Sequence, residues 1–391
     1  DGGRNVLLTN TIMSPSLKRA IAISGLDHVQ YDAIDYSAFR KAAEIDFGIN
    51  TFPSYKFDQA DVIVTIGADF LATFADAVYY EGEWAKNRNP ESGKMSRMHA
   101  FETNMSLTGS NADYRTMVKP SDHGKVATAL LNAVNGQGTA GTLSKGVQSA
   151  IEAAAKDLKG AGKRALVLAG LNDLNLQRVV NAINEALGAI ETTVNFERND
   201  LYQGSSNDLI KLTSDMSTGR VKTLIIADCN PSYDAVNATA FSAALEKVNL
   251  TISTSTLSDE TASRCRIIAP THHWLESWGD LQIEDGRIDL VQPTISPLNN
   301  TRGWGESLLV WSGQAMDWYT FLRQTHSPGY TPDEMYTCNN WNIAVHNGFT
   351  DSGAIGQATP NYSGKSLINA VADLNNKQGG AFELALYEKS T

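Results

Sequence analysis

Short, continuous apolar runs recur along the chain, and segments with helical spacing of apolar residues lie between them. The runs cover residues 4–9, 29–32, 61–66, 164–169, 190–194, 223–227, 250–254 and 266–269. In the longer runs the apolar residues follow one another without alternation, which is typical of parallel strands buried on both faces. The pattern therefore predicts parallel sheets built from these segments.

Amphipathic segments predict helices between most of these strands. They span residues 15–24, 36–47, 122–134, 147–158, 176–187, 207–216, 238–248, 306–311 and 318–323. Ser14 and Pro15 are typical of a helix start, and Gly25 is typical of its end. Strands that alternate with helices favour an α/β fold, so we predict two doubly wound, Rossmann-like units with parallel sheets.

The order of these elements predicts where the units begin and end. We expect a first α/β unit at 1–134, a linker at 135–146, a second unit at 147–293, and an irregular, partly helical extension at 294–391 that completes the first unit. The linker matches a dinucleotide fingerprint at Gly136, Gly138 and Gly141, but a helix precedes it, so we interpret it as a flexible connection. Residues 382–387 predict a last strand.

Residues 81–114 interrupt the pattern of the first unit. They are rich in Asn, Gly, Met and charged residues, and they show no clear period. We therefore predict an irregular insertion that closes the cleft between the two units, with Met98 or Phe101 buried near the carboxyl ends of the strands. Arg97, Glu102 and Arg115 are expected to pair with one another or with the acid that follows residues 61–66.

Composition narrows the class of protein. A chain of 391 residues is too long for one core, and its net charge of −11 argues against nucleic acid or anionic lipid as a partner. The sequence holds no apolar run of 18 residues that would predict a membrane span. Cys229, Cys265 and Cys338 are widely spaced and show no metal-binding pattern. The chain opens on Asp1-Gly2 without a leader-like stretch, so we expect a fragment or the mature part of a longer protein.

A stretch near residue 270 carries a family resemblance. Glu260-Thr261-Ala262 precedes the strand that ends at Pro270, and Trp274-Leu275-Glu276, Gly279 and Glu284-Asp285-Gly286-Arg287 follow in order. This succession resembles the late α/β region of the molybdopterin oxidoreductase family. The resemblance implies an α/β fold whose strand-end loops approach a pterin nucleotide.

Two strand-end loops depart from that family's pattern. They are Gly67-Ala68-Asp69 and Asp228-Cys229-Asn230, where the family typically reads Gly-x-Asn-Pro. A carboxylate beside a pyrophosphate is repulsive, and a side chain at a glycine position obstructs backbone approach. We therefore expect no bound cofactor, and interpret Gly67, Asp69, Asp228, Asn230 and Glu276 as vestigial pterin-loop positions.

Catalytic and metal-binding residues are also not evident. Asp32 or Asp35 stands near the place of the family's metal ligand, but an Asp at a strand end is more often a helix cap. His272 and His273 are interpreted as a hydrogen-bonded loop pair rather than a catalytic pair. Six of the tryptophans lie in the last third of the chain, which favours core packing or a subunit interface. We predict no catalytic residue and no metal ligand.

Several stretches resemble one branch of the family. They are Tyr31–Ala33, Ala60–Leu71, Gly93–Arg97, Phe101–Arg115 and Leu290–Leu298. They are similar to the large iron–sulfur subunit of bacterial alternative complex III, a quinol:electron-acceptor oxidoreductase. In that branch a molybdopterin-enzyme-like half carries no molybdenum cofactor, and a following half carries iron–sulfur clusters.

The branch resemblance implies a role and partners. This chain would be the cofactor-free scaffold half, with the clusters in a half that follows Thr391. Its partners would be multi-helix quinol-binding subunits and cytochrome c subunits at the periplasmic face of the bacterial inner membrane. Two alternatives stay open: an active molybdenum-bis-pterin reductase of the polysulfide or thiosulfate type, and a free soluble binding protein.

Overall fold

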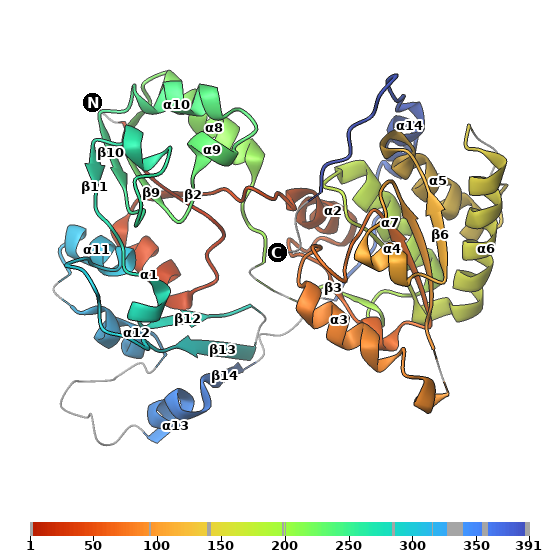
Figure 1. Ribbon diagram of the computed structural model, residues 1–391, viewed down its shortest axis with the longest axis horizontal. Coiled ribbons are helices and arrows are strands. Elements are labelled where there is room, and N and C mark those ends of the chain that lie inside the picture. Colours follow the sequence, from red (N-terminus) through yellow and green to blue (C-terminus); the bar gives the residue numbers. More distant parts are fainter. Residues whose placement is uncertain are drawn as a thin grey trace. The chain divides into compact units, whose positions relative to one another are not determined.

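The computed structural model describes residues 3–93, 95–138, 142–197, 199, 201–283, 286–314, 316–326, 339–353 and 359–387. The chain forms two compact units, and each unit is built from two separate chain segments. Unit 1 comprises Asp1–Ser37 and Arg198–Gly356, and unit 2 comprises Ala38–Glu197 and Gln357–Thr391. Unit 2 is therefore inserted into unit 1 after the second strand of the latter (Figure 1).

Unit 1 contains a five-stranded parallel sheet with the order β11-β10-β9-β1-β2. Its strands are β1 (Arg4–Thr9), β2 (Asp27–Gln30), β9 (Val221–Ala227), β10 (Leu250–Ser253) and β11 (Ile267–Ile268). In β1, Val6 and Leu8 pack with the helices on one face of the sheet, and Leu7 packs with those on the other face. Burial on both faces explains why β1 reads as a continuous apolar run.

Helices cover both faces of this sheet. The helices of unit 1 are α1 (Pro15–Ser24), α8 (Ser206–Ser217), α9 (Pro231–Asp234), α10 (Ala238–Leu245), α11 (Trp304–Trp311), α12 (Trp318–His326) and α13 (Asn339–Asn347), of which α13 packs against the antiparallel sheet described below. Residues of α8 and α10 share one core cluster with the sheet, and residues of α1 and α11 share the other. Unit 1 also holds an antiparallel sheet of β12 (Gly279–Leu281), β13 (Gly286–Val291) and β14 (Phe349–Gly353).

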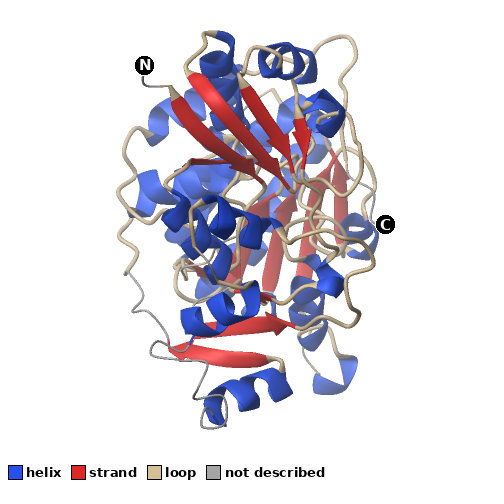
Figure 2. Cartoon of the chain, turned by 90° about the vertical axis from the view of Figure 1, so that its left-hand side faces the viewer, coloured by secondary structure: helices blue, strands red, loops and turns tan. Residues whose placement is uncertain are grey.

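Unit 2 contains a four-stranded parallel sheet with the order β6-β5-β4-β7. Its strands are β4 (Val62–Ile66), β5 (Arg97–Glu102), β6 (Tyr114–Met117) and β7 (Ala165–Ala169), and a small antiparallel pair is formed by β3 (Ser54–Tyr55) and β8 (Val194–Asn195). Its helices are α2 (Ser37–Phe47), α3 (Ala77–Lys86), α4 (Leu107–Asn111), α5 (His123–Val134), α6 (Lys145–Ala161), α7 (Leu174–Leu187) and α14 (Leu367–Asn376). Strands run side by side in each sheet, with helices against them (Figure 2).

The predicted fold class is confirmed, since both large sheets are parallel and are packed against helices. The first predicted helix, 15–24, also has the predicted ends. The Ser14 side chain accepts a hydrogen bond from the amide of Leu17 at 3.0 Å, Pro15 is the first helical residue, and Gly25 adopts a left-handed conformation with φ of 65°. These local signals define α1 without help from the rest of the chain.

The predicted domain boundaries differ from the observed ones. We expected units at 1–134 and 147–293, but β1 and β2 pair with β9 rather than with β4, and β4 pairs with β7. The extension 294–391 was expected to complete the first unit as a whole, yet it is divided between unit 1 and unit 2. Strand pairing is non-local, and each continuous apolar run suits either sheet, so local patterns do not reveal an inserted domain.

The irregular insertion predicted at 81–114 is also wrong. This segment contains the end of α3, all of β5 and α4, and the start of β6. Met98 and Phe101 are buried as predicted, but as residues of a sheet strand and not of a plug. His99 and Glu102 in the same strand obscured its pattern. Both side chains can be buried because each has a partner: His99 lies 2.9 Å from Asp157, and Glu102 lies 2.5 Å from Arg115.

Two other predictions concern connections and ends. Residues 382–387 do not form the predicted strand, and Phe382 in this segment is 98% exposed. The linker 135–146 follows α5 and leads into α6, but Gly141 within it lies outside the described residues. The same holds for Glu284, Asp285 and Cys338.

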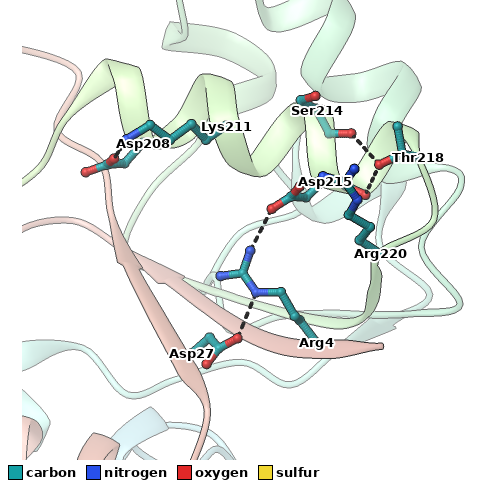
Figure 3. Close-up of polar contacts among 8 residues, drawn as sticks. All are labelled: Arg4, Asp27, Asp208, Lys211, Ser214, Asp215, Thr218 and Arg220. Atoms are coloured by element: carbon teal, nitrogen blue, oxygen red, sulfur yellow. Dashed lines mark hydrogen bonds and ion pairs between the residues drawn. The ribbon is translucent and has the colours of Figure 1, made fainter. Parts of the chain in front are cut away.

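A polar network ties the amino-terminal edge of the unit 1 sheet to α8. Arg4 in β1 donates hydrogen bonds to Asp27 of β2 at 2.8 Å and to Asp215 of α8 at 2.7 Å (Figure 3). Arg220 also donates to Asp215, at 3.0 Å. These partly exposed ion pairs lie at the edge of the sheet opposite to the one that carries the candidate site, and each contributes little to stability.

Candidate functional site

Both parallel sheets reverse their strand order at one point. In unit 1 the reversal lies between β1 and β9, and in unit 2 it lies between β4 and β7. Loops at the carboxyl ends of such neighbouring strands diverge and leave a crevice, which is where open α/β sheets bind ligands. Each unit therefore has one position where a ligand is expected.

The crevice position of unit 2 is closely packed. Gly67 follows β4 with φ of 62°, and Gly170 follows β7. A side chain at Gly170 would bring its Cβ to 2.3 Å from the carbonyl oxygen of Gly67, so the two loops touch through their backbones. Leu171 and the buried ring of His123 also lie against Gly67. Among the described residues neither ring nitrogen of His123 has a hydrogen-bond partner, and burial lowers its pKa.

Asp69 has a structural role at this position. Its Oδ1 accepts a hydrogen bond from the amide of Thr108 at 2.9 Å, which joins the loop after β4 to the start of α4. Its carbonyl oxygen accepts further bonds from the amides of Thr73 and Phe74. Thus Asp69 fixes the loop after β4 through hydrogen bonds within unit 2.

The crevice position of unit 1 opens into a large pocket. Its volume is about 970 Å³, and its walls come from the carboxyl ends of β9 and β10, the loop after β11, and the first residues of α11 and α12. The aromatic lining residues are Trp274, Trp278, Trp304, Trp318 and Tyr319. The acidic lining residues are Asp228, Asp234, Asp259, Glu276, Asp280, Glu306 and Asp317.

Asp228 lies at the end of β9 in a left-handed conformation, with φ of 57°. It corresponds in this respect to Gly67 at the end of β4. Its Oδ2 accepts a hydrogen bond from the indole nitrogen of Trp304 at 2.8 Å. Burial raises the pKa of Asp228, although the bond from Trp304 lowers it in part. Burial beside this carboxylate also raises the pKa of the Cys229 thiol well above its ordinary value.

Other carboxylates of the lining accept hydrogen bonds from backbone amides at or near the starts of helices. Asp259 accepts hydrogen bonds from the amides of Thr261 and Ala262, and Asp317 accepts one from the amide of Thr320 at 2.9 Å. These neutral donors stabilise each carboxylate without supplying the full positive charge of a lysine or arginine.

Asp280 differs from the other acidic residues of the lining because its side chain is fully buried. It accepts hydrogen bonds from Ser14 and Ser16 of the α1 start and lies 2.6 Å from Nε2 of His326. This cluster joins β12 to α1 and α12, so Asp280 has a structural role in the pocket wall.

The pocket therefore has an unbalanced negative charge. Within the described residues, its lining contains seven carboxylates and neither lysine nor arginine. Apart from Asp280, whose partner is His326, none of these carboxylates forms an ion pair in the part of the chain that the structure describes. A pocket of this charge disfavours a pyrophosphate and favours a cation.

Asp32 and Asp35 do not lie in the pocket. The two oxygens of Asp32 accept hydrogen bonds from Thr11 and from the amide of Gly204, and Asp35 accepts from the amides of Ser37 and Ser206. Burial raises the pKa of Asp35, but these hydrogen bonds outweigh it and lower the pKa overall. Both carboxylates thus stabilise loops of unit 1.

His272 and His273 line the pocket, and both make local hydrogen bonds. The Nδ1 of His272 lies 2.8 Å from the hydroxyl of Thr301. The Nδ1 of His273 accepts a bond from the amide of Leu275 at 3.3 Å, while Glu276 accepts one from the amide of His273. His273 and Glu276 thus form a reciprocal cap, and both histidines lie in a loop and make hydrogen bonds, as predicted.

The five positions that the sequence predicts to be vestigial pterin-loop positions do not belong to one unit. Gly67 and Asp69 lie in unit 2, whereas Asp228, Asn230 and Glu276 line the pocket of unit 1. The tryptophan walls of this pocket, Glu306 of α11 and Asp317 before α12 were not predicted as parts of a site. The clustering of tryptophans in the last third of the chain was the available signal.

Two features are absent from the residues that the structure describes. No group of three or more His, Cys, Asp or Glu side chains is arranged to hold a metal ion. Among these same residues, no helix has the length and apolar character required to cross a bilayer.

Comparison with known proteins gives one curated relative. The molybdopterin-binding-like subunit of menaquinone reductase from Nitratidesulfovibrio vulgaris is 24% identical over 238 residues. The match covers 57% of this chain and 32% of the relative, so the chain spans about a third of the length of that protein. No protein-family model matches the chain.

Solved structures share the fold. Acetylene hydratase from Pelobacter acetylenicus has a TM-score of 0.59 at 10% identity, covering 79% of this chain and 55% of that chain. A chain of the formyltransferase/hydrolase complex from Methylorubrum extorquens has a TM-score of 0.53 at 13% identity, covering 80% and 91%. At these identities the likeness concerns the fold alone. The chain thus shares the α/β fold of these structures, and over part of its length it is similar to a protein named as a molybdopterin-binding-like subunit.

Proposed function

We propose that this chain is a pterin-free, molybdopterin-enzyme-like scaffold within a membrane-bound quinol oxidoreductase complex. The relative named as a menaquinone reductase subunit supports a quinone-related role. The finer assignment is to the iron–sulfur subunit of alternative complex III, at the periplasmic face of the membrane. It rests on the resemblance of stretches such as Ala60–Leu71 and Leu290–Leu298.

The charge of the unit 1 pocket is the observation that carries this proposal. A pterin dinucleotide brings a pyrophosphate, which requires backbone amides, lysines or arginines at the strand ends. The lining instead presents Asp228 and Asp259 beside the loop that would hold the phosphates, and among the described residues it has no Lys or Arg. The residues of this pocket therefore do not fit the cofactor.

The packing in unit 2 supports the same proposal. The contact between the Gly67 and Gly170 backbones fills the crevice position there, and Asp69 directs a carboxylate into a hydrogen bond with Thr108. A nucleotide phosphate would need to displace these contacts. The alternative of an active molybdenum-bis-pterin reductase is disfavoured on the same grounds, since Asp32 and Asp35 are hydrogen-bonded to loops rather than directed into the pocket.

Purification of the full-length protein from its native membranes tests the role as a scaffold. We expect multi-helix quinol-binding subunits and cytochrome c subunits to co-purify in constant ratio, and the assembly to oxidise a quinol. A chain that elutes alone after mild detergent extraction would instead favour a free binding protein.

A further inference from the structure

We propose that the pocket of unit 1 binds an organic cation, with an ammonium or guanidinium group carried on an apolar body. The pocket of about 970 Å³ lies at the upper end of the size range of small-molecule sites, roughly 300–1,000 Å³. This proposal is independent of the proposed scaffold role, because binding of a cation in this pocket requires neither a pterin nor partner subunits.

The aromatic walls suit the apolar body and the charge of such a ligand. Trp274, Trp278, Trp304, Trp318 and Tyr319 come from three separate segments and line one pocket. The indole nitrogen of Trp304 donates a hydrogen bond to Asp228, and that of Trp318 donates one to the carbonyl of Trp278. These bonds fix the positions of the two rings. Fixed indole faces attract cations at distances within about 6 Å.

The carboxylates determine the sign of the charge. Asp228, Asp234, Asp259, Glu306 and Asp317 face the pocket, and in the described part of the chain none of them is neutralised by a lysine or arginine. Aromatic walls of low dielectric focus the field of such groups and concentrate counter-ions in the cleft. An anion or a neutral ring of the same size would lack this attraction.

Two carboxylates allow the charge to be removed without loss of their structural role. Asp228 accepts a hydrogen bond from Trp304, and Asp317 accepts one from the amide of Thr320. Asparagine supplies an oxygen acceptor at both places. It also tolerates the left-handed conformation of residue 228, so Asp228→Asn/Asp317→Asn should fold normally.

Titration of the purified full-length protein with benzyltrimethylammonium tests the proposal, with benzoate as the anion of similar size and benzyl alcohol as the neutral ring. The readouts are calorimetry and tryptophan fluorescence, because four of the seven tryptophans line this pocket. We expect saturable 1:1 binding of the cation, at least about tenfold tighter than either control ligand. Lowering the pH should weaken it as the carboxylates take up protons.

Matched variants locate the binding. Asp228→Asn/Asp317→Asn should weaken binding of the cation about tenfold or more, and Trp274→Ala, at the exposed mouth, should weaken it severalfold. The control, Asp208→Asn, removes a charge from exposed Asp208 on α8, outside the pocket (Figure 3), and should leave affinity unchanged. Equal binding of benzoate, absence of saturable cation binding, or equal effects of the pocket and control variants would overturn the proposal.

Discussion

The carboxylate of Asp228 accepts a 2.8 Å hydrogen bond from the indole nitrogen of Trp304, which lies 76 residues further along the chain. This bond joins the end of β9 to the first residue of α11, and it holds a charged group where the family's pattern has a glycine. The bond fixes Asp228 in the acidic, tryptophan-lined wall of the pocket.

Substitutions at Asp228 should separate its hydrogen bond from its charge. Asp228→Ala removes the acceptor of the nearly buried Trp304 indole and places alanine in a left-handed conformation, so we expect a loss of about 2–3 kcal/mol in the free energy of unfolding. Asp228→Asn keeps the acceptor and should stay within about 0.5 kcal/mol of the parent chain. Urea unfolding followed by tryptophan fluorescence measures both. Equal losses for the two variants would show that the hydrogen bond contributes little.

His28 should make unit 1 sensitive to acid. Burial, together with the nearby charge of Lys18, lowers the pKa of His28 from 6.5 to about 4. Because the folded state prefers the neutral ring, stability is complete above pH 6.5 and is lost as the pH falls toward 4, by at most about 1.4 kcal/mol per pH unit.

His28→Gln retains a partner for the Thr9 hydroxyl, which lies 2.9 Å from the His28 ring, and should remove this part of the pH dependence. Unfolding midpoints of both chains between pH 7.5 and pH 4.5 provide the comparison. Parallel curves for the two chains would contradict the assignment to His28.

The buried ion pair of unit 2 should be essential to its stability. Asp46 is fully buried and accepts hydrogen bonds from Arg178 at 2.9 Å and from Asn181 at 3.0 Å. Arg178→Met would leave this carboxylate without a counter-charge, at a cost of about 3–5 kcal/mol.

The double variant Asp46→Leu/Arg178→Met removes both charges and should be markedly more stable than the single variant. Thermal unfolding followed by circular dichroism compares the two chains. A double variant as unstable as Arg178→Met alone would show that packing, rather than charge, dominates at this place.

His272 and His273 are expected to have no catalytic role. The ring of His272 forms a hydrogen bond with the hydroxyl of Thr301, and the ring of His273 accepts one from the amide of Leu275. We therefore expect His272→Gln/His273→Gln to leave quinol oxidation by the proposed complex near its normal rate. Turnover is measured on complexes whose subunit ratio has been checked. A loss of several orders of magnitude in a fully assembled complex would assign chemistry to one of the two rings.

The sequence predicts those elements whose signals are local. Ser14, Pro15 and Gly25 define α1 because the cap, the first turn and the left-handed end each involve neighbouring residues. In contrast, β5 was missed because its buried His99 depends on Asp157, which lies 58 residues away. Burial of a polar side chain in a core costs free energy unless a hydrogen-bond partner is present, and here that partner is distant in the sequence.

The candidate site was predicted in part. The loop at Asp228 and Asn230 was identified from its place after an apolar run, and its departure from the Gly-x-Asn-Pro pattern was apparent from the sequence. The pocket itself requires α11 and α12 to lie over the carboxyl ends of β9 and β10. That arrangement follows from non-local packing, for which tryptophan clustering is only an indirect signal.

Elemental analysis of the purified full-length protein tests most directly the proposal that this chain binds no molybdopterin cofactor. Molybdenum and tungsten would be measured by mass spectrometry, and pterin by fluorescence of an oxidised acid extract. If the acidic lining around Asp228 excludes the cofactor, both metals and the pterin should be far below one per chain, even after expression with added molybdate. Stoichiometric metal and pterin would contradict the account and favour an active reductase.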